Sequence, residues 1–239
     1  MARAIRICLT GATGLIGTAL VRACVGREDV RLIAASRREI DLPPGARMEV
    51  LVADRAHWGD AIAAAQPDVV VCALGTTWKE AGKDEAAFRA VDEKLVLDCA
   101  RWGLEAGARQ FIAVSSVGAD RQARGLYLRV KGEVEAALAK SGYERLDILR
   151  PGLLVGRRES VRPLERAGQI AAPLMDLFLL GGLARFRSVR ADTMAEAILA
   201  LAHEKARGRF VHEHEAIKRA IRRQTYASAV NQAIAATID

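Results

Sequence analysis

Residues 4–26 read AIRICLTGATGLIGTALVRACVG, and this stretch decides the fold. The short apolar run over residues 4–10 predicts a buried β-strand. The longer pattern over residues 15–26 predicts a helix. Between them, Gly11, Gly14 and Gly17 stand at a GxxGxxG spacing. A strand that passes through a glycine-rich turn directly into a helix is typical of the first unit of a dinucleotide-binding sheet.

The chemistry of this turn follows from its glycines. Glycine permits a tight bend and lets the backbone approach a pyrophosphate closely. The free N–H groups at the start of the following helix and the helix dipole both favour negative charge. We therefore predict that the turn binds the cofactor through Gly11, Thr13, Gly14, Leu15, Ile16 and Gly17.

The remainder of the first 150 residues alternates short β-branched runs with helical patterns, which predicts a parallel sheet buried on both faces. Six strands are expected, at residues 4–10, 30–36, 48–53, 68–74, 110–116 and 145–150, and four helices at 15–26, 56–66, 84–106 and 125–141. The predicted fold is an α/β, Rossmann-type, doubly wound parallel sheet in the order 3-2-1-4-5-6.

The regular alternation stops after Arg150. Three prolines punctuate residues 151–190, and then a helix over 191–203, a short strand over 209–212 and a basic helical tail are expected. We predict one domain over residues 1–239, with 151–190 and 213–239 as small C-terminal substrate or cap segments. The apolar stretch at residues 174–180 could form a core helix, a greasy substrate pocket or a partner surface.

The end of the second predicted strand discriminates between nicotinamide cofactors. An NAD site usually has a carboxylate there for the ribose 2′-OH, whereas this chain has Ser36, Arg37 and Arg38. Two guanidinium groups suit a 2′-phosphate, so NADP(H) is the predicted cofactor. Asp54, after the third strand, could meet the adenine amino group or simply cap a helix.

The fourth predicted strand ends in Leu74, Gly75 and Thr76. The first and fourth strands flank the switch point of such a sheet, so these residues should pass along the cofactor. Small residues there allow the dinucleotide to lie close.

A catalytic group is predicted from the fifth strand and the helix that follows it. Ser115 and Ser116 end the strand, and Tyr127 and Lys131 stand four residues apart on one helical face. A neighbouring ammonium favours the phenolate that a tyrosine needs for proton exchange near neutrality. Lys131 can also bind the nicotinamide ribose, and a serine hydroxyl can hold the substrate oxygen; of the two serines, Ser116 is preferred.

The motifs GATGLIG, the Ser-Ser strand end and YLRVK resemble the short-chain dehydrogenase/reductase superfamily in its extended or atypical branch. More closely, five stretches resemble the oxidoreductase family named for the Tat-interacting protein 30: SRR (36–38), ALGTTWKEAGKDEAAFRAVD (73–92), SSVGAD (115–120), YLRVKGEVE (127–135) and LRPGLLVGRRES (149–160). The resemblance implies NADP(H) contacts at Arg37, Arg38, Leu74, Gly75, Lys131, Arg150, Pro151, Gly152 and Leu153.

The chain departs from this pattern at two points. Extended members of the superfamily commonly carry an asparagine of a proton relay where this chain has Asp92, and a carboxylate alters that relay. Some relatives use the position after the two serines, which here is Val117.

The predicted function is an NADP(H)-dependent oxidoreductase that transfers hydride between nicotinamide and a carbonyl or alcohol, with an apolar substrate as one option. A non-catalytic NADPH-binding regulatory or scaffold protein is the alternative, with a partner or lipid-like ligand near residues 160–190. A sugar-nucleotide epimerase is less favoured, because the region after the sixth strand is short for a nucleotide-sugar domain.

Composition excludes several other classes. With 239 residues the chain can bury a full core, and the four cysteines lack ligand spacing, which favours a reducing, cytoplasmic compartment. No stretch reads as a membrane span or as a signal peptide.

The net charge of +7 is concentrated after Arg150. The chain has no nucleic-acid-binding motif there, so no nucleic-acid partner is expected. His212 and His214 lack a third ligand, so no metal is expected. The oligomeric state stays open, with a homodimer through the fourth and fifth helices as one arrangement.

Overall fold

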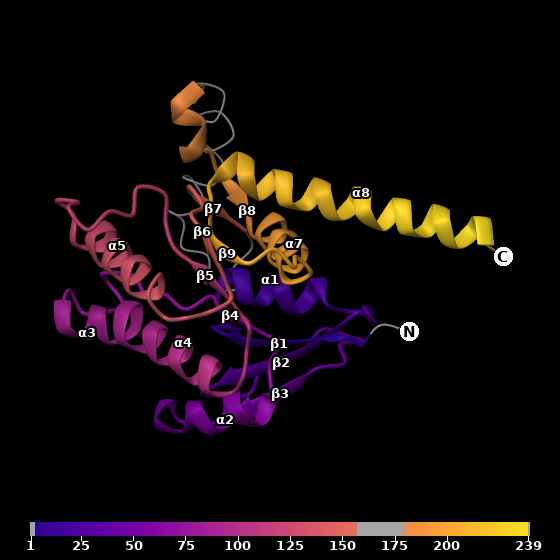
Figure 1. Ribbon diagram of the computed structural model, residues 1–239. Coiled ribbons are helices and arrows are strands. Elements are labelled where there is room, and N and C mark those ends of the chain that lie inside the picture. Colours follow the sequence, from indigo (N-terminus) through magenta and orange to yellow (C-terminus); the bar gives the residue numbers. More distant parts are fainter. Residues whose placement is uncertain (1–2, 157–178, 180, 239) are drawn as a thin grey trace.

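The computed structural model describes residues 3–156, 179 and 181–238. Its main element is a seven-stranded sheet in the order β3-β2-β1-β4-β5-β6-β9, with every neighbouring pair parallel (Figure 1). The strands are β1 (Ile5–Thr10), β2 (Val30–Ser36), β3 (Glu49–Val52), β4 (Val69–Cys72), β5 (Gln110–Val114), β6 (Arg145–Leu149) and β9 (Gly208–His212).

The strand order confirms the predicted 3-2-1-4-5-6 topology and adds β9 beyond β6. Strand β1 pairs with β2 on one side and with β4 on the other. The chain reverses its direction of winding at this point, so the switch point of the sheet lies between β1 and β4.

Helices cover both faces of the sheet (Figure 1). One face carries α1 (Leu15–Ala23), α7 (Ala191–Ala202) and the start of α8 (His214–Ile238); the other carries α2 (Trp58–Ala65), α4 (Val96–Glu105) and α5 (Leu126–Leu138). Successive strand residues point to opposite faces. Ile7 and Leu9 therefore pack in the core beneath α1 and α7, whereas Cys8 packs in the core beneath α2 and α4.

The single helix expected over residues 84–106 is divided into three segments. Asp84 caps α3 (Glu85–Arg89) by accepting hydrogen bonds from the backbone of Ala86 and Ala87. A π-helical segment, η2 (Ala90–Leu95), then leads into α4. Such a segment accommodates an extra residue per turn and is frequent at functional sites. Here it contains Asp92, whose side chain is fully buried.

The region after β6 contains elements that the sequence pattern did not predict. Two short strands, β7 (Leu154–Val155) and β8 (Val189–Arg190), form a separate parallel pair, and a 3-10 turn, η3 (Gly181–Phe186), precedes β8. Of the apolar stretch at residues 174–180, only Leu179 lies within the described residues. The proposed substrate or cap role of 151–190 stays a prediction.

The basic C-terminal tail forms α8, which projects beyond the body of the molecule (Figure 1). Ile217 and Ala220 near its start are buried. Among the helices that the structure describes, none combines the length and the apolar character needed to cross a bilayer.

Candidate functional site

The predicted site residues gather at one edge of the sheet. Because all the strands are parallel, their carboxyl ends meet at the same edge. The glycine turn follows β1, residues 36–38 follow β2, residues 74–76 follow β4, and the two serines follow β5. The topology therefore brings together positions as far apart in the chain as Gly11 and Ser116.

The glycine turn is shaped so closely that larger side chains would not fit. Gly11 has a φ of +88°, and a Cβ there would lie 2.5 Å from the carbonyl oxygen of Ala73. A Cβ at Gly17 would overlap the carbonyl oxygen of Gly11. Gly14 is less confined, with the same oxygen 3.2 Å from its virtual Cβ. The turn thus allows α1 to begin close to β4.

The first turn of α1 provides unsatisfied positive partial charge. Gly14 is its N-cap, no side chain caps it, and the turn contains no acidic residue. The free N–H groups and the helix dipole can therefore accept a phosphate. Thr13 is exposed beside them, and Leu15 and Ile16 begin the helix. This geometry fits the pyrophosphate of a dinucleotide.

A group of three guanidinium side chains lies at the carboxyl ends of β2 and β3. Arg37 and Arg38 are exposed, and within the described residues no carboxylate pairs with them or with Arg55. Partial burial and the positive charge of Arg37 together lower the pKa of Arg55, which begins the short 3-10 turn η1 (Arg55–His57). Like charges held together without counter-ions favour an anionic ligand.

Two neighbours of this group have different surroundings. Ser36 is buried, and its hydroxyl oxygen accepts a hydrogen bond of 3.4 Å from the backbone of Arg38. Asp54 is the N-cap of η1, but its carboxylate is exposed and makes no capping hydrogen bond. The carboxylate of Asp54 therefore remains accessible to a ligand.

The end of β4 is connected to the predicted catalytic residues through Asp92. The backbone N–H of Thr76 donates a hydrogen bond of 2.7 Å to Asp92 Oδ2. A Cβ at Gly75 would lie 3.6 Å from the other carboxylate oxygen. Leu74 is half-buried against the core beneath α4.

Asp92 forms a buried ion pair with Lys131. Lys131 Nζ lies 2.8 Å from Asp92 Oδ1, and the side chains are 6% and 0% exposed respectively. Burial by itself would lower the pKa of Lys131, but the attraction of Asp92 and Tyr127 outweighs it, so the pKa is raised. Lys131 is therefore held as an ammonium in a dry environment.

Tyr127 stands beside this pair on α5. Lys131 Nζ lies 5.9 Å from the centroid of the Tyr127 ring, and the tyrosine is 42% exposed. The structure thus brings the predicted Tyr–Lys pair together, with the lysine inside and the tyrosine at the surface. It adds Asp92 as the direct partner of the lysine.

The two serines have different partners. Ser115 is buried, and its hydroxyl donates a hydrogen bond of 2.5 Å to Glu135 on α5. The carboxylate of Glu135 also accepts hydrogen bonds from Nε and Nη2 of Arg150, at 3.0 and 2.5 Å. Ser116 is half-buried, and its hydroxyl donates only a long bond of 3.3 Å to the carbonyl of Val117. Ser116 is the serine whose hydroxyl is less engaged.

The segment that follows β6 completes the edge. The carbonyl of Pro151 accepts a hydrogen bond of 3.0 Å from Val117, and Leu153 is exposed. Gly152 approaches the backbone of Phe186 so closely that a Cβ would not fit. Arg150 already donates hydrogen bonds to Glu135. For its predicted contact with the cofactor, it would have to divide its N–H groups between that carboxylate and the cofactor.

Sequence reasoning missed two residues of this region. Glu135 stands one helical turn after Lys131, so the same i,i+4 spacing that identified the Tyr–Lys pair would have placed it on that face. Arg55 directly follows Asp54 at the end of the third predicted strand, where a basic residue repeats the Arg37 pattern.

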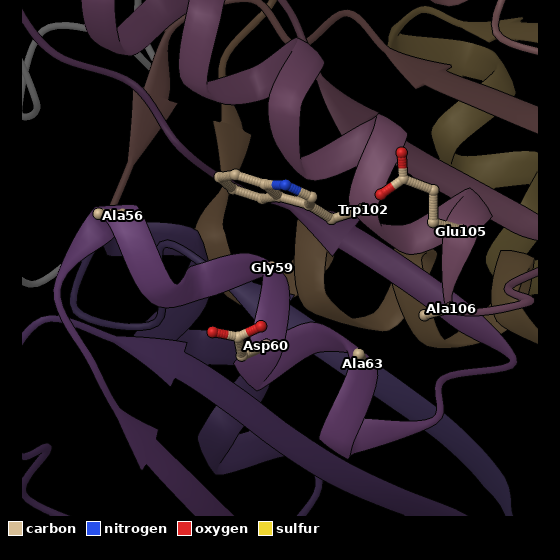
Figure 2. Close-up of a pocket in the computed structure, with 7 residues that line it drawn as sticks. All are labelled: Ala56, Gly59, Asp60, Ala63, Trp102, Glu105 and Ala106. Atoms are coloured by element: carbon tan, nitrogen blue, oxygen red, sulfur yellow. The ribbon is translucent and has the colours of Figure 1, made fainter.

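A separate groove lies between α2 and α4 (Figure 2). Its volume is about 340 Å³, and its lining residues are Ala56, Gly59, Asp60, Ala63, Trp102, Glu105 and Ala106. None of them is a predicted site residue. Trp102 and Glu105 extend from α4 on one side of the groove, and Asp60 lies on α2 on the other side.

These features define a class of protein, the Rossmann-type dinucleotide binders. The chain matches the NAD(P)H-binding family over residues 11–172. It is 32% identical over 197 residues to the Emericella nidulans protein named fmp52, mitochondrial, a match that covers 80% of this chain and 81% of that protein. It is 44% identical over 98 residues to the Rattus norvegicus protein HTATIP2, covering 41% of this chain and 40% of that protein.

Solved structures share the fold. MoeE5 in complex with UDP-glucuronic acid and NAD has a TM-score of 0.64 at 16% identity, covering 86% of this chain and 74% of that chain. The enzyme WbmG of Bordetella bronchiseptica in complex with NAD has a TM-score of 0.63 at 17% identity, covering 90% and 76%. The protein belongs to the NAD(P)H-binding family and is an atypical short-chain dehydrogenase/reductase, which confirms the resemblance found in its motifs.

Proposed function

We propose that this protein is an NADP(H)-dependent oxidoreductase that acts on a carbonyl or alcohol. The observation that carries the proposal is the position of Tyr127 beside the buried Asp92–Lys131 pair. A half-exposed phenol next to a fixed ammonium is suited to proton exchange with a substrate oxygen. The group lies at the same edge of the sheet as the glycine turn, where the family binds its cofactor.

Each residue then has a distinct role. Tyr127 gives its hydroxyl proton to the substrate oxygen during reduction and accepts it during oxidation. Lys131 stabilises the phenolate and binds the nicotinamide ribose, and Ser116 orients the substrate oxygen. The bound NADP(H) supplies or accepts the hydride. Asp92 acts as a positioning residue, because it holds Lys131 and Thr76 at once.

The preference for NADP(H) over NAD(H) rests on the arginine group. Arg37 and Arg38 replace the carboxylate that a ribose 2′-OH would need, and Arg55 adds a third positive charge. An accessible guanidinium can bind a 2′-phosphate with two parallel hydrogen bonds. Asp54, exposed beside them, is assigned to the adenine amino group.

Titration of the protein with NADPH and NADH at one fixed salt concentration tests this assignment. We expect the wild type to bind NADPH more tightly and Arg37→Asp to lose that preference, because a carboxylate repels the 2′-phosphate. Arg109→Asp is the matched control, since Arg109 is exposed at the opposite edge, just before β5. Equal affinity for both nucleotides in the wild type contradicts the NADP(H) assignment.

The alternative function, a regulatory or scaffold protein that binds NADPH without turnover, predicts tight binding and no oxidation of NADPH with any carbonyl. The epimerase alternative is not favoured, because the segment between β6 and β9 is short for a nucleotide-sugar domain. A homodimer stays an untested prediction, and sedimentation of the NADPH complex would test it.

We propose the cytoplasm as the compartment of this protein. The four cysteines are free thiols, as expected in the reducing cytoplasm. The word mitochondrial belongs to the names of the fungal relatives. Imaging of the tagged full chain distinguishes the two locations.

A further inference from the structure

Trp78 projects from a well-ordered turn beside the proposed catalytic group. The turn follows β4, and Thr77 and Glu80 bind one another reciprocally, with backbone-to-side-chain hydrogen bonds of 3.0 and 3.1 Å. Thr76, at its start, is bound to Asp92. The turn is therefore anchored to the same carboxylate that holds Lys131.

Trp78 and Tyr127 each contact one buried ring. The ring centroids of Trp78 and Phe88 are 6.3 Å apart with an interplanar angle of 67°, and those of Phe88 and Tyr127 are 6.1 Å apart at 57°. Phe88 is 1% exposed, whereas Trp78 and Tyr127 are 43% and 42% exposed. Phe88 therefore links two rings that are both partly exposed to solvent.

An exposed indole in this position requires an explanation. Aromatic side chains contribute to stability mainly through the area they bury, and Trp78 leaves much of its surface in water on a hydrogen-bonded turn. Isolated apolar residues on a surface are ordinary, but this one continues through Phe88 to a proposed catalytic tyrosine. The exposed parts of Trp78 and Tyr127 therefore border the same buried ring, Phe88.

We propose that Trp78 forms one wall of the substrate site and selects substrates that carry an aromatic ring next to the reacting carbonyl or alcohol carbon. The inference rests on the proposed oxidoreductase function and goes beyond it by naming the substrate class. The ring of the substrate packs on the indole while its oxygen meets Tyr127. Trp78 acts as a specificity-determining residue and takes no part in proton transfer.

Binding of two amides to the NADPH-loaded protein tests the inference without requiring turnover. Benzamide and propanamide are carbonyl compounds that resist reduction, and only benzamide has a ring. We expect calorimetry to show tighter binding of benzamide, and Trp78→Ala to weaken it about tenfold while propanamide is unaffected. Trp78→Phe should restore most of the affinity. Trp102→Ala, in the groove between α2 and α4, is the matched control and should change neither amide.

Turnover provides the second readout. With benzaldehyde and propanal, Trp78→Ala should raise the KM for benzaldehyde about tenfold, leave its kcat nearly unchanged, and leave propanal unaffected. If neither aldehyde is reduced but the preference for benzamide depends on Trp78, the result counts against the oxidoreductase proposal, while the aromatic-binding wall stands. If Trp78→Ala keeps the wild-type preference for benzamide, the inference is overturned. Unchanged NADPH affinity in Trp78→Ala verifies that the variant is folded.

Discussion

Lys131 and Asp92 form an ion pair of 2.8 Å that is almost completely withdrawn from solvent, and it joins α5 to the π-helical segment η2. The carboxylate also accepts a hydrogen bond from Thr76, so it is connected to the end of β4. A relay asparagine at this position would be neutral. In this protein the lysine ammonium is matched by a full negative charge, and the pair as a whole is neutral.

Asp92→Asn should therefore destabilise the protein strongly. The amide keeps an oxygen for Thr76 but leaves the Lys131 ammonium buried without a counter-charge, at a cost of about 3–5 kcal/mol near neutral pH. Burial then lowers the pKa of Lys131, so the loss should shrink as the pH rises toward 10. Denaturant unfolding between pH 7 and 10 measures this effect.

The double variant Asp92→Asn/Lys131→Met provides the control for that experiment. Removing the ammonium should recover most of the lost stability, because the buried charge is gone. A loss in Asp92→Asn that persists in the double variant would show that the carboxylate acts through shape rather than through charge.

The topology could be predicted because two strong patterns agree. The β-branched runs identify strands, and the glycine turn after the first strand fixes the switch point. The positions of the helices were also predictable, but the π-helical segment η2 was not. The extra residue in its turn does not disturb the 3.6-residue pattern over residues 84–106 enough to be recognised. The strands β7 and β8 have two residues each, which is too short for any periodicity to appear.

The Tyr127→Phe variant should lose turnover and keep cofactor binding. The hydroxyl is the proposed proton donor, and general acid catalysis of this kind contributes about 10²–10⁴-fold to a rate. The ring, which packs against Phe88, is retained. We expect NADPH affinity within about twofold of wild type. A stopped-flow and steady-state comparison checks both values, and retained turnover would remove Tyr127 from its role.

The partners of the site residues were less predictable than the residues themselves. Motif spacing located Tyr127 and Lys131, yet a sequence pattern does not say which carboxylate meets a given cation across the fold. The pairing of Asp92 with Lys131 and that of Glu135 with Ser115 became visible only when η2, α5 and β5 were placed together. Successive residues of a strand point to opposite faces, which indicates only that the two serines point in different directions. Their hydrogen bonds, to Glu135 and to the carbonyl of Val117, distinguish them chemically.

The two serines should respond differently to truncation. Ser115→Ala removes a buried hydrogen bond to the charged Glu135 and should cost about 1.5–3 kcal/mol of stability. Ser116→Ala should change stability by less than about 0.5 kcal/mol. It should lower kcat, because we propose that Ser116 orients the substrate oxygen. Unfolding and kinetics of both variants decide the assignment. The reverse pattern would make Ser115 the catalytic serine.

Arg55→Ala should weaken NADPH binding and leave NADH binding unchanged. The expected rise in the Kd for NADPH is about five- to tenfold, because one charge-assisted hydrogen bond to the 2′-phosphate is lost. The effect should diminish as salt is added, since the contact lies at the surface. An equal loss for both nucleotides would place Arg55 near a part of the cofactor that they share.

The contribution of Cys8 to stability should fall as the pH rises above about 9, because burial makes this thiol resist ionisation. Burial, with a smaller contribution from Cys72, raises the pKa of Cys8 from 9.0 to about 12. Between these values the unfolded chain has lost the Cys8 proton and the folded chain retains it. The stability that this group contributes is complete below pH 9 and is lost as the pH rises toward 12.

For this one proton the free energy of unfolding should fall by up to about 1.4 kcal/mol per pH unit within that window. Cys24, whose pKa burial raises to about 11, adds to the decline. Urea unfolding under reducing conditions at pH 8 to 10.5 measures the slope. Cys8→Ala should make it shallower, whereas Ile7→Val, a non-titrating change in the same strand, should lower stability and keep the wild-type slope. Equal slopes in all three proteins would mean that Cys8 ionises as readily in the folded state as in the unfolded one.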